Sequence, residues 1–160
     1  AAIAQVLKSC IDDLKLAIDS MEPVDADLLL LLATLRYRAG PRLEESGIRL
    51  QWQVEPVAAL DWLEPKASLH ILRILQEALA NAVKHADATT ITVATRMQGD
   101  QVAIVVHDNG RGFDASAAST GRGLANQRRR AQDIGATVHL ASSAAGTCLV
   151  LLLPVDRRRA

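Results

Sequence analysis

The chain has 160 residues, of which 49% are hydrophobic and 22% are charged, a composition that predicts one compact domain with room for an appended element. Its 18 basic and 18 acidic residues cancel and only 2% are aromatic, which argues against a nucleic-acid surface or a base-stacking platform. The distant cysteines Cys10 and Cys148 argue against a disulfide framework or a structural zinc site.

The first predicted element is a helix with a heptad pattern. Its apolar residues recur in steps of four and three: Ile3, Leu7, Cys10, Leu14, Ala17 and Met21. This seam predicts packing in a helical bundle, the alternative being a helix that packs on its own domain. Glu22-Pro23 ends the helix because proline cannot continue the hydrogen-bond ladder. Since the chain starts inside this pattern without Met, we expect it to be a piece of a longer protein.

A second helix and a strand follow. Asp25 is the predicted N-cap of a helix that continues to about Ala39 and stops at Gly40-Pro41. Its apolar run, residues 28–35, is less than half of the roughly 20 residues that span a bilayer, so we expect no membrane contact from this chain. Residues 48–54 alternate strictly between apolar and polar and predict a half-buried strand.

The third predicted helix carries a polar face. It starts at Pro65, since proline suits the first turn of a helix, and continues to about Ala86. At about 100° per residue, five polar side chains fall on one side: Arg73, Glu77, Asn81, Lys84 and His85. The opposite side is apolar and predicts contact with the core, so the polar face is free for chemistry.

The rest of the chain contains two hairpins, a loop and a helix. Residues 89–95 and 101–107 predict strands joined by a turn at 98–100, and the sequence D-N-G-R-G-F follows at Asp108 to Phe113. Residues 114–120 are Ala and Ser without a period and predict a mobile loop. The last elements are a helix opened by Gly121-Arg122-Gly123 and ended by Gly135, a hairpin at 136–141 and 147–153, and a fraying tail at 156–159.

This order of elements predicts the fold class. Hairpins mixed with crossover helices give a mixed, mostly antiparallel sheet with helices on one face, an α/β (α+β) two-layer sandwich. The uncovered face of such a sheet stays polar, which the alternation in residues 48–54 fits.

The polar face of the third helix offers ligands for a metal-bound polyphosphate. Asn81 provides a neutral oxygen that suits Mg²⁺ held mostly by phosphates and waters, or is a helix-surface amide. Glu77 can orient or deprotonate an attacking group, or is a solvated glutamate. Lys84 and His85 can contact phosphate, while a lysine near a helix end also serves as a partner of the helix dipole.

The glycine-rich segments extend this hypothesis. Asp108 can accept a hydrogen bond from an exocyclic amine in a closed pocket, or it starts a turn. A helix that opens at Gly123 presents free N–H groups to an anion, although glycines of this kind also occur as simple turn residues. Neither glycine pair fits a Walker A loop, because no Gly-Lys-Ser/Thr follows, or a Rossmann fingerprint, because the order of strand, glycines and helix differs.

Three spaced motifs resemble a known family. E-x-x-x-N-x-x-K-H, D-N-G-x-G-F and G-x-G-L, followed by G-T-x-L-x-L-x-L-P, resemble the N, G1 and G2 boxes of the ATP-binding domain of bacterial two-component sensor histidine kinases. The resemblance covers about Asp25 to Pro154 and implies the Bergerat fold, shared with gyrase, mismatch-repair and heat-shock chaperone ATPases. The segments G-L-A-N-Q-R-R-R-A-Q-D-I-G and S-G-I-R-L-x-W resemble the subfamily that signals to response regulators with helix-turn-helix output domains.

The resemblance implies ATP and Mg²⁺ as cofactors and a role for each matching residue. Asn81 would coordinate Mg²⁺ and Glu77 would assist phosphoryl transfer. Lys84 and His85 would approach the phosphates, and Asp108 would bind adenine N6. The remaining nucleotide-binding residues would line the adenine pocket, the phosphate-side hinge and the helix that follows it: Gly110, Gly112, Gly121, Arg122, Gly123, Leu124 and Thr147.

The sequence also departs from the family pattern. Gln127 stands where the family usually has Met, a phenylalanine box is not evident and the lid is short. By the resemblance, residues 1–22 are the C-terminal end of the dimerisation and phosphoacceptor helix, residues 24–155 are the ATP-binding catalytic domain and residues 156–160 are a tail. Of the four histidines only His107 precedes an acidic residue, and it ends a strand, so we expect the phosphoacceptor histidine to lie outside this chain.

The predicted function is therefore the catalytic domain of a sensor histidine kinase. We expect this domain in the cytoplasm, either in a cytoplasmic protein or as the cytoplasmic part of a membrane-anchored sensor. Its partners would be its own upstream dimerisation domain, which forms a homodimer in the full-length protein, and a response regulator of the helix-turn-helix class. Nucleic acid is not an expected partner. One alternative is an anti-sigma-factor-like serine kinase on the same fold, which the N-terminal heptad seam disfavours. Another is a non-catalytic nucleotide-binding interaction module.

Overall fold

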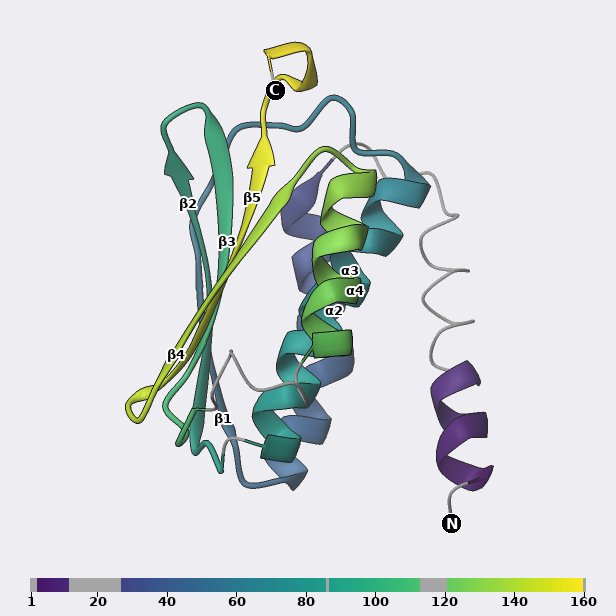
Figure 1. Ribbon diagram of the computed structural model, residues 1–160, viewed down its shortest axis with the longest axis vertical. Helices are drawn as coiled ribbons and strands as arrows, with labels where there is room; N and C mark the ends of the chain where they lie inside the picture. The colour runs from purple at the N-terminus through teal and green to yellow at the C-terminus, as the bar shows by residue number, and fades with distance from the viewer. Residues whose placement is uncertain (1–2, 12–26, 86, 113–120, 160) are drawn as a thin grey trace.

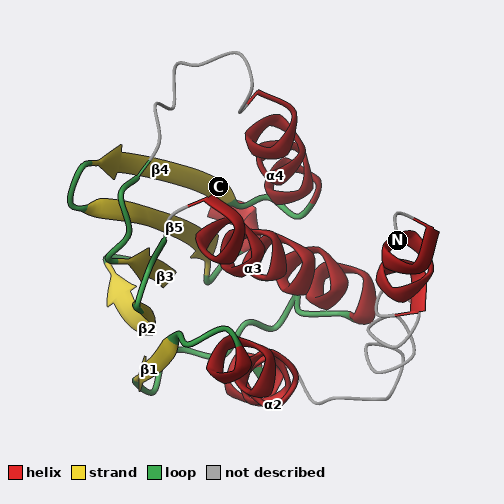
Figure 2. Cartoon of the chain, turned by 90° about the horizontal axis from the view of Figure 1, so that it is seen from below, coloured by secondary structure: helices red, strands yellow, loops and turns green. Residues whose placement is uncertain are grey.

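The computed structural model describes residues 3–11, 27–85, 87–112 and 121–159. In this part of the chain a five-stranded sheet is covered on one face by the helices α2, α3 and α4 (Figure 1, Figure 2). The predicted two-layer sandwich is confirmed. No helix among these residues is long and apolar enough to cross a membrane.

The sheet is mixed and mostly antiparallel, as predicted. Its strands are β1 (Arg49–Val54), β2 (Thr90–Gln98), β3 (Gln101–Asp108), β4 (Thr137–Ser143) and β5 (Gly146–Pro154), in the order β1-β2-β3-β5-β4. Only the pair β1 and β2 is parallel among the described strands, because α3 connects these two strands as a crossover, whereas hairpins connect β2 to β3 and β4 to β5. The register pairs Asp108 with Thr147, which places both residues at one end of the sheet.

The second helix is longer than predicted. α2 spans Leu28–Glu45, and its N-cap is Asp27, whose side chain accepts a hydrogen bond of 2.9 Å from the backbone N–H of Leu29. The predicted N-cap, Asp25, lies outside the described residues. The predicted stop at Gly40-Pro41 is wrong, because the helix continues through both residues for another turn.

Burial explains why α2 passes through a proline. Proline inside a helix costs about 3 kcal/mol, but the extra turn carries Leu43 into the core, where it is 3% exposed. Burial of a leucine contributes about 1.5–3 kcal/mol. Gly40 adds a local reason, because without a Cβ it avoids the clash that a proline ring makes with a preceding helical residue.

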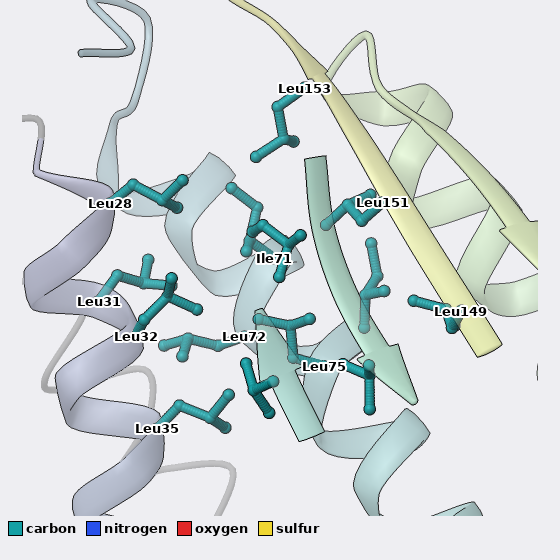
Figure 3. Close-up of a cluster of buried hydrophobic side chains, with 14 of the residues drawn as sticks. Leu28, Leu31, Leu32, Leu35, Ile71, Leu72, Leu75, Leu149, Leu151 and Leu153 are labelled. Atoms are coloured by element: carbon teal, nitrogen blue, oxygen red, sulfur yellow. The ribbon is translucent and has the colours of Figure 1, made fainter. Parts of the chain in front are cut away.

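The core lies between the helical layer and the sheet. α3 (Pro65–His85) starts and ends close to the predicted residues, and its apolar side is buried as its periodicity predicts. Figure 3 shows its side chains meeting those of α2 and β5 in one cluster, with Leu28, Leu31, Leu32, Leu35, Ile71, Leu72, Leu75, Leu149, Leu151 and Leu153 labelled. The polar side of α3 is therefore left to face away from this cluster.

The N-terminal helix exposes most of its apolar side chains. Residues 3–11 are helical, and their large apolar side chains are between 50% exposed at Ile11 and 77% exposed at Ile3. The described part of the seam, residues 3–11, is thus not covered by the described domain. The predicted seam residues from Leu14 to Met21 lie outside the described residues.

The C-terminal tail is ordered, contrary to the prediction of fraying. Residues Arg157–Arg159 form a short 3-10 helix, and the guanidinium of Arg157 lies 4.7 Å from the centre of the Trp62 ring. The indole N–H of Trp62 donates a hydrogen bond of 2.7 Å to the carbonyl of Pro154. The tail is therefore held by a residue from the connection between β1 and α3.

Candidate functional site

The polar face of α3 meets the start of α4. α4 (Gly121–Asp133) begins at Gly121, so the predicted glycine opening belongs to the helix itself. A Cβ built on Gly123 would lie 3.7 Å from Oε1 of Glu77, which places this carboxylate beside the first turn of α4. The first turn of α4 and the exposed carboxylate of Glu77 thus border one region, with half-buried Asn81 one turn further along α3.

Of the other residues predicted to lie near the phosphates, the structure describes some side chains and not others. Lys84 is exposed in the last turn of α3, and Leu124 is half-buried in the first turn of α4. The side chains of His85 and Arg122 lie outside the described positions, although their backbones belong to α3 and α4. The loop between Phe113 and Thr120 also lies outside the described residues.

Asp108 forms the other end of the candidate site. It is the last residue of β3 and is 6% exposed. Its Oδ1 accepts hydrogen bonds from the backbone N–H of Gly110 at 2.9 Å and of Thr147 at 3.4 Å. The turn-initiating role considered from the sequence is therefore present. Both of these bonds use Oδ1 of the carboxylate.

Two glycines allow the Asp108 turn to pack against the hairpin of β4 and β5. Gly112 has a φ of +68°, and a Cβ there would overlap the carbonyl oxygen of Ser143. Gly146 has a φ of +131°, and a Cβ there would overlap the carbonyl oxygen of Asp108. The sequence motif predicted a role for Gly112 in the pocket. Gly146 was part of the G-T-x-L motif, but no role was predicted for it.

Asn109 is a second residue that sequence reasoning missed. Its Oδ1 accepts from the backbone N–H of Thr89 at 3.0 Å and of Thr90 at 2.9 Å, and its Nδ2 donates to the hydroxyl of Thr89 at 2.9 Å. These bonds tie the Asp108 turn to the segment that follows α3. The signal in the sequence was an asparagine inside a turn, where a short polar side chain commonly bonds to nearby backbone.

Two groups outside the candidate site, His70 and Cys148, have shifted pKa values. Burial lowers the pKa of His70 on α3, the Asp133 carboxylate raises it in part, and Arg130, Lys66 and Arg73 lower it further. His70 is therefore neutral near pH 7. On the sheet, burial raises the pKa of the Cys148 thiol, Arg96 lowers it and Asp108 raises it. Neither group supplies a charge to the Glu77 region.

The described side chains offer oxygen ligands rather than a metal cage. No group of three or more His, Cys, Asp or Glu side chains in the described ranges is placed to hold a metal ion. The amide of Asn81 and the carboxylate of Glu77 are the donors on the polar face of α3. Such a set suits Mg²⁺ that takes most of its ligands from phosphates and water.

Comparison with known sequences gives the family. Residues 66–157 match the family model described as histidine kinase-, DNA gyrase B-, and HSP90-like ATPase. The sensor protein VraS of Staphylococcus haemolyticus is 38% identical over 90 residues, which cover 55% of this chain and 26% of that protein. VraS of Staphylococcus aureus strain COL is 36% identical over the same shares. The aligned part is thus about a quarter of the length of these relatives.

Solved structures share the fold. The histidine kinase domain of the blue-light activated histidine kinase from Erythrobacter litoralis EL346 superposes with a TM-score of 0.71 at 21% identity, over 93% of this chain and 74% of that chain. The catalytic domain of the histidine kinase ThkA superposes with a TM-score of 0.67 at 14% identity, over 83% of this chain and 95% of that chain.

The matched family residues include α3, both glycine segments and the β4–β5 hairpin, so every predicted site residue lies inside the matched range. The two-layer fold is the one found in histidine kinase catalytic domains. The chain therefore belongs to the histidine kinase-, DNA gyrase B- and HSP90-like ATPase family.

Proposed function

We propose that residues 24–155 bind Mg-ATP and pass its γ-phosphate to a histidine on a dimerisation domain, which then phosphorylates a response regulator. One observation carries this proposal: the structure brings Glu77 beside the first turn of α4, while Asp108 is buried at the end of the sheet. The first location suits phosphates and a metal ion, and the second suits a purine amine.

At the phosphate end, Asn81 binds Mg²⁺ and Glu77 orients the attacking imidazole. The backbone N–H groups at Gly121 and Gly123 stabilise phosphate charge, as free N–H groups at a helix start do. Lys84 and Arg122 add positive charge near the phosphates, and His85 approaches them as a hydrogen-bond donor. Phosphoryl transfer needs positioning and charge stabilisation rather than covalent chemistry by the domain, and these groups supply both.

At the adenine end, Asp108 accepts a hydrogen bond from the exocyclic amine. The N–H of Gly110 bonds to Asp108 within the turn, Gly112 lets the turn lie close to the hairpin, and Gly146 lets the backbone of Asp108 approach it. Thr147 contacts the base from β5, while Leu124 provides apolar contact from α4. The hydrogen bonds of Asn109 hold this end against the start of β2.

The phosphorylated histidine lies outside this chain. His107 precedes Asp108 in sequence, but alternate strand residues point to opposite faces, so His107 lies on the uncovered face while Asp108 is buried. His70 is half-buried at the contact of α3 and α4, and His139 is exposed on the uncovered face beside Val150. None of these three is next to Glu77.

Residues 1–22 form the end of the dimerisation helix in this proposal, and the tail is residues 156–160. The exposed seam of residues 3–11 supports a homodimer through a bundle, because it has apolar side chains without cover from the described domain. The regulator is of the helix-turn-helix class, by the resemblance of α4 and β1. The domain acts in the cytoplasm, where ATP and response regulators are available.

Incubation with labelled ATP tests the transfer. We expect no acid-labile phosphate on this chain alone, and label on a separately supplied dimerisation domain of the parent protein. The same mixture with Glu77→Gln should transfer more slowly, because the amide cannot act as a base. Stable label on the chain alone would contradict the proposed location of the acceptor, and an absence of transfer to the added domain would contradict the kinase function.

A further inference from the structure

Three polar side chains are buried in the described part of the chain: Thr95, Asp108 and Gln127. The hydroxyl of Thr95 bonds to both backbone groups of Glu55, and Asp108 organises the turn described above. Gln127 is 3% exposed on α4. Burial of a carboxamide costs free energy unless it is hydrogen-bonded, so its partner matters.

The partner of Gln127 is the backbone of the neighbouring helix. Its Nε2 donates a hydrogen bond of 3.3 Å to the carbonyl oxygen of Ile74 in α3. A carbonyl has two lone pairs, so this oxygen can accept from the side chain in addition to its own helical N–H. α3 and α4 lie next to each other (Figure 2), and this bond is a directional contact between them.

The bond lies next to the candidate phosphate region. Gln127 follows Gly123 by one helical turn, and Ile74 precedes Glu77 by nearly one turn. Gly123 faces Glu77, so the two helices run antiparallel through these two contacts. A helix rises about 1.5 Å per residue, so a slip of one residue between the helices would move Gly123 by about that distance from Glu77.

We propose that Gln127 is a positioning residue for the bound nucleotide. Its bond to Ile74 fixes α4 along α3, and it thereby sets the distance between the free N–H groups at Gly121 and Gly123 and the metal and phosphate ligands Asn81 and Glu77. Interdigitated apolar side chains restrain how the two helices pack, and the hydrogen bond adds a directional contact between one defined residue of each helix. This proposal rests on the proposed nucleotide site, and Gln127 itself does not touch the ligand.

The variant Gln127→Met tests the proposal, because methionine keeps the length and volume of the side chain and removes the donor. Gln132→Met is the matched control, since Gln132 is exposed on the same helix. Dissociation constants are measured for Mg-ATP, which needs both ends of the site, and for adenosine, which needs only the Asp108 end. Thermal unfolding of each variant shows that it is folded.

The expected result is selective. The net value of one hydrogen bond corresponds to roughly a three- to tenfold change in an equilibrium constant. Because α4 is no longer held in the register that binds the phosphates, we expect Mg-ATP affinity to fall by up to that factor with Gln127→Met. Adenosine affinity should change by less than about twofold, and Gln132→Met should bind both ligands as the wild type does. Equal weakening for both ligands, or no change for either, would overturn the proposal.

A second variant keeps the test decisive. Gln127→Leu provides a buried side chain of similar size that has no donor for Ile74, so the same selective loss is expected. If both variants failed to fold while Gln132→Met folded, Gln127 would belong to the stability of the core and the proposal would be overturned. A wild type that binds no Mg-ATP would instead refute the proposed function, so the two failures are distinguishable.

Discussion

Gly112 and Gly146 show how backbone freedom creates the purine end of the site. Both have positive φ, and a Cβ at either position would overlap a carbonyl oxygen of the opposing segment. The Asp108 turn can therefore lie against the β4–β5 hairpin only if these positions carry no side chain. The hydrogen bond from Thr147 to Asp108 depends on that approach.

Gly112→Ala should destabilise the domain more than Gly99→Ala does. Both residues have φ near +65° (+68° and +63°), but Gly99 has nothing within 4 Å of a built Cβ, whereas Gly112 has Ser143 there. Gly99→Ala costs only the backbone strain, about 1 kcal/mol, and the clash at Gly112 should add about 1–3 kcal/mol. Denaturant unfolding measures the difference. Equal costs would show that Gly112 does not contact the hairpin.

The sequence predicted a role for Asp108 in the site but not the role of its neighbour Asn109. Asp108 was predicted because a buried strand leads into a glycine turn, which is a local signal. The bonds of Asn109 join residues that are 19 and 20 positions apart in sequence. Such partners depend on the exact register of β2 against β3, which the turn length sets. The sequence predicted this turn at residues 98–100, whereas β2 ends at Gln98 and β3 starts at Gln101.

At the scale of elements, α2 and the tail show where local signals fail. Periodicity over many residues predicted α3 and the strands, because burial of one face follows directly from it. Gly40-Pro41 predicted a helix end, but burial of Leu43 outweighed that local preference. Arg157 was assigned to a fraying tail because its aromatic partner, Trp62, is far away in sequence. Tertiary contacts decided both cases.

Pro41→Ala tests the continuous α2. If the helix passes through this position, alanine restores a backbone donor and removes the ring clash, so the free energy of unfolding should rise by about 1 kcal/mol or more. Pro65→Ala is the control, because Pro65 occupies the first position of α3, where proline fits. There alanine should be neutral or destabilising by up to about 1 kcal/mol. A loss of stability with Pro41→Ala would contradict the described helix.

At the scale of the whole molecule, the two-layer sandwich fixes the position of the two ends of the site relative to each other. The crossover through α3 places its polar face beside α4, and the hairpins place Asp108 beside Thr147. The fold class was predictable because the order of helices and hairpins leaves few two-layer arrangements. The hydrogen bond between Gln127 and Ile74 was not, since nothing in the sequence pairs these two residues.

A calorimetric titration with Mg-ATP tests the central claim most directly. The wild-type chain should bind Mg-ATP, and Asn81→Ala should bind it at least about tenfold more weakly, because even the loss of an outer-shell partner of a metal costs about 10–100-fold. Gln132→Ala, which removes an exposed amide from α4, should bind as the wild type does. Absence of binding by the wild type, or equal binding by Asn81→Ala, would contradict the assigned nucleotide site.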